Sequence, residues 1–215
     1  MKIAILGAEC SGKTTLAKRL AAELTRQGFS ACFVAEALRE WCDRNQRTPK
    51  ANEQTDIAKL QIQRIQDAPA VDYLIADTTA LITAIYSEII FNDPSLYPLA
   101  LENQQSFDLT LVMGLDLLWV ADGIQRDGVA IQSAFDAKLR HVLQSQGIGF
   151  SVIYGSGDER FDNAMTAVAT ISKVQHLPQE KTARQSPWQW VCEKCSDAQC
   201  EHRTFTALLE AKPQP

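Results

Sequence analysis

The feature that most constrains this chain is a G-x-x-x-x-G-K-T sequence at residues 7–14, directly after the apolar run 2–6. Its two glycines let the backbone curl around an oxyanion with N–H groups pointing inward, and Lys13 can reach the outer phosphates of a nucleotide. Thr14 supplies a hydroxyl for Mg²⁺. Apolar residues then recur at helical spacing up to Gly28, so we predict a helix that begins at the phosphates and adds its dipole to the anion site.

This segment, residues 7–14, is called the phosphate loop below. The nucleotide-phosphate site predicted there consists of Gly7, Ala8, Glu9, Cys10, Ser11, Gly12, Lys13, Thr14 and Thr15. The alternative is a glycine-rich turn between a strand and a helix that binds no anion, in which Lys13 and Thr14 occur by chance. The strand before the motif and the helix after it favour the phosphate site.

Composition limits the class of protein. The chain has 215 residues, of which 46% are hydrophobic, so it can bury one substantial core. Its net charge of −5 and its lack of a long Lys/Arg block disfavour a surface that follows nucleic-acid phosphates. The apolar start is short and runs into the phosphate loop, and no window approaches the ~20 apolar residues that span a bilayer. We expect a soluble cytoplasmic protein with free thiols that binds neither nucleic acid nor membrane.

Short apolar runs alternate with helical patterns from residue 2 to about residue 174, which predicts an α/β fold with a parallel sheet and helices on both faces. Strands are predicted at 2–6, 31–35, 73–76, 109–113 and 150–154. Helices are predicted after the phosphate loop, around 57–65, over 80–90, after a cap at Ser133, and from about Arg160. The predicted domain covers 1–177, followed by a linker at 178–187 and a Cys- and His-containing tail at 188–215.

Two acidic positions follow predicted strands, where ligands of open α/β sheets bind. Asp77 can orient the nucleophile of a phosphoryl transfer and take its proton, or hold the metal through water. Its alternative role is to cap the helix that starts near Thr79.

Glu36 and Arg39 would share a helix face and can hold the hydroxyls of a small acceptor. Their alternative is a surface ion pair worth about 0–1 kcal/mol.

The segment after the fourth predicted strand has the character of a lid, with an aromatic residue, an acid, a glycine and an arginine close together. Arg126 can close over the phosphates and neutralise charge on the transferred group; otherwise it is an ordinary solvated arginine. Asp122 either orients Arg126 or meets the acceptor. Trp119 either stacks on a ring or fills the core.

The segment after the fifth predicted strand contains Gly157 and Arg160, which can contact a nucleotide base. The alternative there is helix capping by Asp158.

The tail contains a compact set of metal-ligating side chains. Three thiolates and one imidazole can complete a tetrahedral zinc site, although the last spacing is tight, and free thiols or a redox pair are the alternatives. The set consists of Cys192, Cys195, Cys200 and His202.

Together these residues resemble the ribosylnicotinamide kinase domain of the bacterial NAD-biosynthesis regulator, and more broadly the P-loop ATPase/kinase group, over about residues 1 to 175. The likeness rests on the phosphate loop, the Glu36/Arg39 pair, Asp77-Thr78, the W-x-x-D-G-x-x-R stretch at 119–126, and the segment 155–160. It implies ATP as phosphate donor and the 5′-hydroxyl of nicotinamide riboside as acceptor, giving nicotinamide mononucleotide.

The sequence therefore predicts a Mg²⁺- and ATP-dependent small-molecule kinase with a five-stranded parallel sheet of the nucleoside/nucleotide-kinase type. Lys13 and the loop amides would hold the outer phosphates, Thr14 the Mg²⁺, Asp77 the acceptor hydroxyl and Arg126 the γ-phosphoryl group. Two alternatives stay open: a kinase for another nucleoside or small alcohol, and a nucleotide-binding ATPase or regulatory module whose tail engages a protein partner.

Overall fold

The computed structural model describes residues 1–117 and 128–172. Its strands are β1 (Lys2–Leu6), β2 (Ala31–Val34), β3 (Tyr73–Asp77), β4 (Leu109–Met113) and β5 (Ser151–Ile153). Its helices are α1 (Lys13–Arg26), α2 (Ala37–Asn45), the short 3-10 helix η1 (Ala51–Glu53), α3 (Gln54–Gln66), α4 (Ala80–Phe91), α5 (Tyr97–Gln104), α6 (Gly128–Ser145) and α7 (Gly157–Ile171). Every predicted strand is present, with ends that differ by at most one residue from those expected.

The strands form one sheet in the order β2-β3-β1-β4-β5, and all neighbours are parallel. All carboxyl ends therefore meet at one edge. The phosphate loop leaves that edge from the central strand, and Asp77 ends the adjacent strand in register with Ile5. The strand order reverses at β1, which is where open α/β sheets place their ligands.

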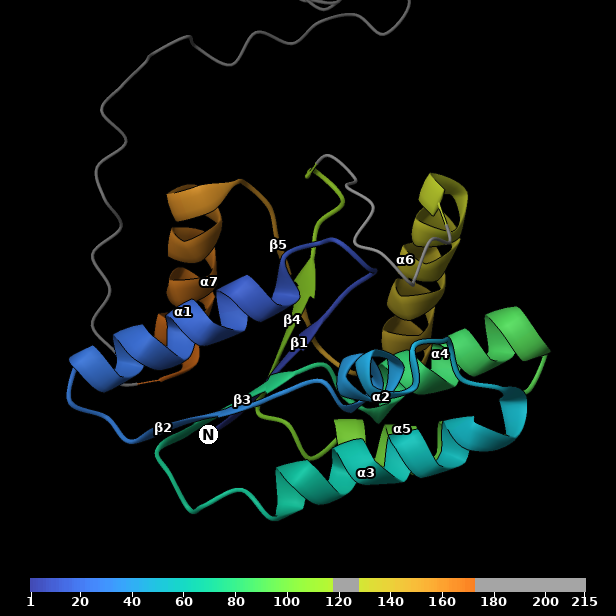
Figure 1. Cartoon of the computed structure of the whole chain (residues 1–215). Helices are drawn as coiled ribbons and strands as arrows, with labels where there is room; N and C mark the ends of the chain where they lie inside the picture. The colour runs from blue at the N-terminus through green and yellow to red at the C-terminus, as the bar shows by residue number, and fades with distance from the viewer. Residues whose placement is uncertain (118–127, 173–215) are drawn as a thin grey trace, which may run out of the picture. The chain divides into compact units, whose positions relative to one another are not determined.

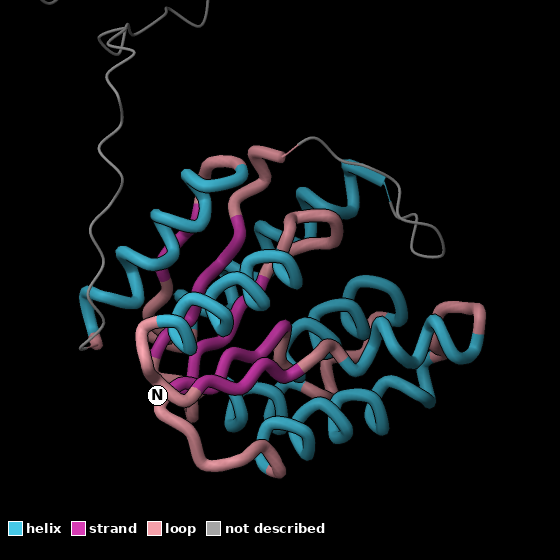
Figure 2. Tube along the Cα trace, turned by 60° about the vertical axis from the view of Figure 1, so that its left-hand side comes forward, coloured by secondary structure: helices cyan, strands magenta, loops and turns pink. Residues whose placement is uncertain are grey.

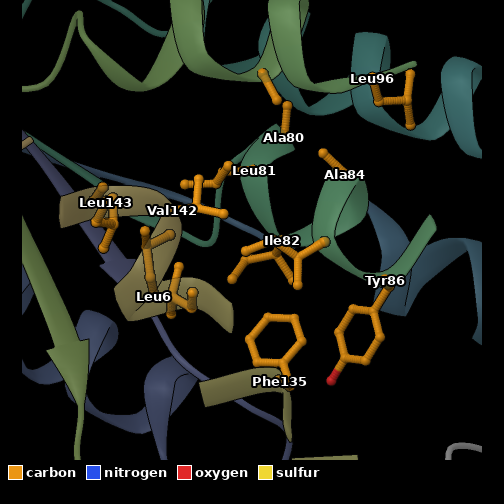
Figure 3. Close-up of a cluster of buried hydrophobic side chains, with 14 of the residues drawn as sticks. Leu6, Ala80, Leu81, Ile82, Ala84, Tyr86, Leu96, Phe135, Val142 and Leu143 are labelled. Carbon is orange, nitrogen blue, oxygen red and sulfur yellow. The ribbon is translucent and has the colours of Figure 1, made fainter. Parts of the chain in front are cut away.

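Helices cover both faces of the sheet, as predicted, and alternation along β1 divides the core between them. Ala4 and Leu6 face a cluster with α4 and α6, whereas Ile3 and Ile5 pack with α1 and α7. Figure 1 shows α1 and α7 on one side of the strands and α3, α4 and α5 on the other, and Figure 2 shows the strands between these layers. Figure 3 shows Leu6 against Phe135 and other side chains of the first cluster.

Two details of the helices differ from the predictions. Helix α6 begins at Gly128, so Ser133 lies inside it and does not cap it. A serine marks a helix start only where the chain before it cannot be helical, and here the helix simply continues through it. The patterns also missed α2 and α5, which are only 9 and 8 residues long. Pro98 lies in the first turn of α5, where a proline does not break a helix.

The predicted linker at 178–187 and the tail at 188–215 lie outside the described residues. Among the helices of the described part, none combines the length and the apolar character needed to cross a bilayer.

Candidate active site

The phosphate loop is closed on itself by two side chains that share one acceptor. The Ser11 hydroxyl donates to the backbone carbonyl of Ala8 at 2.7 Å, and the Lys13 ammonium donates to the same carbonyl at 2.8 Å. Gly7 has φ 151°, and a Cβ there would lie 2.9 Å from Cβ of Met113 on β4. Glycine is therefore required at this position, and the ammonium is held over the loop, where a phosphate oxygen can replace the carbonyl as its acceptor.

Thr14 and Asp77 form the second part of the site. The Thr14 hydroxyl donates to Oδ2 of Asp77 at 2.5 Å, and Asp77 is buried. Its Oδ1 is also buried and has no hydrogen-bond partner among the residues that the structure describes. Thr79, and not Asp77, caps α4, because its hydroxyl accepts from the Leu81 N–H. A hydroxyl next to a carboxylate with an unsatisfied oxygen is the set of oxygen ligands that suits Mg²⁺.

Glu36, which follows β2, lies close to this group. Its side chain is 11% exposed, and its Oε2 lies 3.6 Å from Nε of Arg39, as predicted for a pair on one helix face. Burial raises the pKa of Glu36 above its ordinary value, the charge of Asp77 raises it further, and Lys13 and Arg39 oppose the shift. The tertiary structure thus brings sequence-predicted residues from the start of α2, the end of β3 and the phosphate loop within electrostatic reach of one another.

Arg160, for which contact with a nucleotide base is predicted, lies among backbone carbonyls and a carboxylate. It is 5% exposed, donates to the backbone carbonyls of Ser11 and Gly155 at 2.6 Å each, and pairs with Asp116. Asp116 was not predicted as a site residue, although it is an acid that follows a strand, β4, much as Asp77 ends β3. It also accepts a hydrogen bond from the Gly155 N–H at 2.5 Å. Arg160 therefore ties the phosphate loop to the segments that follow β4 and β5.

A pocket of about 160 Å³ lies beside the first turns of α1 and α7. Arg19 lies over the ring of Phe161, 4.4 Å from its centroid, and bonds Asp158 at 2.8 Å. Asp158 thus forms an ion pair in the first turn of α7, whose N-cap position is Ser156. The pocket is lined by Gly12, Thr15, Leu16, Arg19, Leu117, Gly157, Arg160 and Phe161.

A second pocket, of about 140 Å³, adjoins the phosphate loop at Glu9, and no sequence pattern predicted it. Its lining comes from the phosphate loop, α2, the segment between α2 and η1, α3 and α4. The residues are Glu9, Leu38, Thr48, Pro49, Gln54, Tyr86, Ile90 and Phe91. We call it the ring pocket.

Several predicted site residues cannot be placed. Trp119, Asp122 and Arg126 lie outside the described residues, as do Cys192, Cys195, Cys200 and His202 of the predicted zinc set. Within residues 1–117 and 128–172, no group of three or more His, Cys, Asp or Glu side chains is arranged to hold a metal ion.

Comparison with known proteins gives matches of two kinds. A family model described as an AAA domain matches residues 2–160. Among solved structures, NadR protein in complex with NAD and AMP-PNP superposes with a TM-score of 0.66 at 21% identity, covering 82% of this chain and 50% of that one. NadR protein in complex with NR gives 0.65 at 21% identity, covering 82% and 52%. Deoxyadenosine kinase from M. mycoides with products dCMP and dCDP gives 0.58 at 14% identity, covering 80% and 100%.

This chain therefore spans about half the length of the NadR chains. A search of curated proteins finds no match. The structural likeness establishes the fold, a five-stranded parallel sheet of the P-loop nucleotide-kinase type.

Proposed function

Because this chain belongs to the AAA domain family and has the fold of P-loop nucleoside kinases, we propose that it is a Mg²⁺- and ATP-dependent kinase that phosphorylates the 5′-hydroxyl of a nucleoside. The proposed acceptor is nicotinamide riboside, and the product is nicotinamide mononucleotide. The observation that carries the proposal is the convergence of Lys13, the Thr14–Asp77 hydrogen bond and the 11% exposed Glu36 side chain at one edge of the sheet. The likeness to NadR structures that contain NR and AMP-PNP supports the choice of both substrates.

The phosphate loop would bind the β- and γ-phosphates of ATP through its amides. Lys13 would exchange the Ala8 carbonyl for a phosphate oxygen, and the N-terminus of α1 would add its dipole. The pocket beside Gly157 and Arg160 would take the base, with Arg19 and Phe161 forming its outer wall.

Thr14 and Asp77 would hold Mg²⁺. When bound, the ion neutralises charge on the outer phosphates. The hydrogen bond between these two side chains favours the metal role for Asp77 over the acceptor-hydroxyl role that the sequence suggested. Asp77 would then turn its Oδ1, which has no hydrogen-bond partner in the described part of the chain, to the ion or to one of its water ligands.

Glu36 would be the general base. Its carboxylate would take the proton of the acceptor 5′-hydroxyl as the hydroxyl oxygen bonds to the γ-phosphorus and the bond to the β–γ bridging oxygen breaks. A pKa raised by burial makes Glu36 a stronger base than an exposed glutamate. Arg39 would hold the carboxylate in place. Arg126 keeps its predicted role on the γ-phosphoryl group.

The test is transfer of labelled phosphate from ATP to nicotinamide riboside, with three variants. Glu36→Gln should reduce transfer by at least about 100-fold and leave ATP affinity intact, as expected on loss of a general base. Asp77→Asn should abolish the Mg²⁺ dependence of ATP binding, and Lys13→Ala should weaken binding itself. Glu40→Gln, an exposed position on the same helix as Arg39, is the matched control. Binding of ATP without turnover on any acceptor would refute the kinase assignment in favour of a regulatory module.

A second acceptor class is favoured by one observation. The likeness to deoxyadenosine kinase covers 80% of this chain and all of that one. Deoxyadenosine and deoxycytidine therefore belong in the same assay. Faster transfer to either than to nicotinamide riboside would replace the proposed acceptor and keep the reaction.

Zinc in the tail is also part of the proposal. Metal analysis of the purified protein should find about one zinc per chain, and replacing Cys192 and Cys195 by serine should remove it. Zinc-free protein with full activity would argue against the site.

A further inference from the structure

The ring pocket is lined by a glutamine whose buried amide oxygen accepts no hydrogen bond from the described part of the chain. Gln54, the first residue of α3, is 4% exposed and lines the pocket. Its Oε1 is buried and lacks a hydrogen-bond partner among residues 1–117 and 128–172. Leaving such an oxygen unpaired destabilises a fold, so buried polar atoms of this kind call for an explanation. A ligand that donates a hydrogen bond into the pocket supplies one.

The walls of the ring pocket favour a flat ring. Leu38 of α2 lies on its lining together with Ile90 and Phe91 of α4, and these side chains offer apolar surface. Tyr86, also on α4, stacks on Phe135 of α6 with centroids 4.4 Å apart, so the core fixes the position of this wall (Figure 3). Sites for whole drug-sized ligands measure about 300–1,000 Å³. A pocket of about 140 Å³ has room for one ring of a larger molecule.

The location of the ring pocket connects it to the reacting centre. Glu9 of the phosphate loop lies on its lining, and Leu38 follows Glu36 by two positions on the same chain segment. The nearby Cys42 thiol has its pKa raised to about 11, first by burial and then by the charges of carboxylates that include Glu36 and Glu9. Glu9 places a carboxylate on the lining of the pocket, which disfavours an anionic substituent on the ring and suits a neutral or cationic ring.

We propose that the ring pocket receives the non-reacting ring of the acceptor nucleoside, that this ring carries an N–H₂ donor, and that Oε1 of Gln54 accepts its hydrogen bond. The inference rests on the proposed kinase function and adds the property by which acceptors are selected. A carboxamide on a pyridinium ring and an exocyclic amine on a nucleobase share this donor chemistry. A ring that carries a carboxylate where the N–H₂ group would be places a hydrogen-bond acceptor opposite Oε1 of Gln54, which is itself an acceptor, and adds a negative charge beside Glu9.

The experiment compares acceptors in pairs in which one member carries the N–H₂ donor and the other has an oxygen acceptor at the same place. Nicotinamide riboside is set against nicotinic acid riboside, and cytidine against uridine, at fixed ATP. The donor-bearing member of at least one pair should be preferred in kcat/KM by about 100-fold or more, because a site built around one hydrogen bond rejects the analogue that lacks its donor. The pair that shows the preference tells whether the donor is the carboxamide of a pyridinium ring or the exocyclic amine of a nucleobase. Equal use of both members in each pair would overturn the proposal.

The variant Gln54→Met keeps the length of the side chain and removes the acceptor oxygen. It should raise KM for the donor-bearing acceptor about tenfold with kcat within about twofold, because the ring contact is the same in the ground and transition states. It should also reduce the discrimination within the pair. The control Gln63→Met makes the same change at an exposed position of α3 and should alter neither quantity. An unchanged KM in Gln54→Met would overturn the proposal.

Two further measurements separate the ways of failing. A purely structural role for Gln54 predicts a lower melting temperature in Gln54→Met. Removal of a buried amide oxygen that has no partner within the described residues should instead leave the melting temperature equal or higher. Calorimetry with nicotinamide riboside and cytidine tests the ring pocket without chemistry. Binding that Gln54→Met weakens, in the absence of transfer, would refute the kinase function and keep the ring pocket; no binding of either nucleoside would refute the ring pocket.

Discussion

Arg160 is the buried charge whose removal should have the largest effect outside the reacting groups. In Arg160→Met the aliphatic part of the side chain is retained and the guanidinium is lost. The backbone carbonyls of Ser11 and Gly155 then lose a charged donor that lies at 2.6 Å from each. Asp116 loses its ion pair but keeps the Gly155 N–H.

The size of the effect follows from these contacts. A hydrogen bond to a charged group contributes about 1.5–3 kcal/mol. Such a bond is lost by the buried carbonyl of Ser11 and by the partly buried carbonyl of Gly155. The Asp116 side chain is 32% exposed, so water replaces much of its ion pair, and that pair adds at most about 1 kcal/mol. Because one side chain makes all of these contacts, their contributions do not add fully. We expect the free energy of unfolding to fall by about 3 kcal/mol.

Urea unfolding followed by circular dichroism measures this loss. The midpoint should fall by about 1–2 M with an unchanged slope. Affinity for Mg·ATP should fall on the order of tenfold, because the Ser11 peptide then loses the anchor that orients the phosphate loop. Arg160→Lys should be intermediate, since an ammonium lacks the planar fork that reaches several acceptors. Arg26→Met, on the exposed end of α1, should leave the midpoint unchanged. An unchanged midpoint in Arg160→Met would refute the reasoning.

Three other changes give distinct outcomes. Burial raises the pKa of Glu36 in the folded protein, so ionisation of this carboxyl opposes folding, and Glu36→Gln should be more stable than the natural protein at pH 8. The urea midpoints of the two proteins should converge as the pH falls to 4.5, the ordinary pKa of a glutamate. A difference between the midpoints that widens toward acid pH would contradict this. Gly7→Ala should lower stability by more than about 2 kcal/mol and abolish ATP binding, because its Cβ would lie 2.9 Å from that of Met113; an unchanged melting temperature and ATP affinity would argue against this clash. Thr79→Val removes the cap of α4 and a buried hydrogen bond of 2.7 Å to Gln104, so the free energy of unfolding should fall by about 2 kcal/mol. Thr79→Ser should restore it. Full stability in Thr79→Val would show that neither hydrogen bond stabilises the fold.

The sequence determined the parts of this protein that depend on neighbours along the chain. The three central strands, β1, β3 and β4, are nearly continuous apolar runs buried on both faces. The phosphate loop could be predicted locally as well, because the spacing of its glycines, Lys13 and Thr14 along the chain identifies it. Helix boundaries were less well predicted, as Ser133 and the short α2 show, since a weak cap or a short pattern competes with the packing of the rest of the chain.

Only the tertiary structure decided which distant residues meet. The approach of Glu36 to Asp77 and Lys13 depends on the strand order, and the hold of Arg160 on Ser11 joins residues 149 positions apart. The ring pocket requires α2, α3 and α4 to pack around Gln54, whose sequence context shows nothing unusual. A local pattern reflects the free energy of burying one segment or of forming one turn. These contacts arise instead because several segments pack in one core and end at one edge of the sheet.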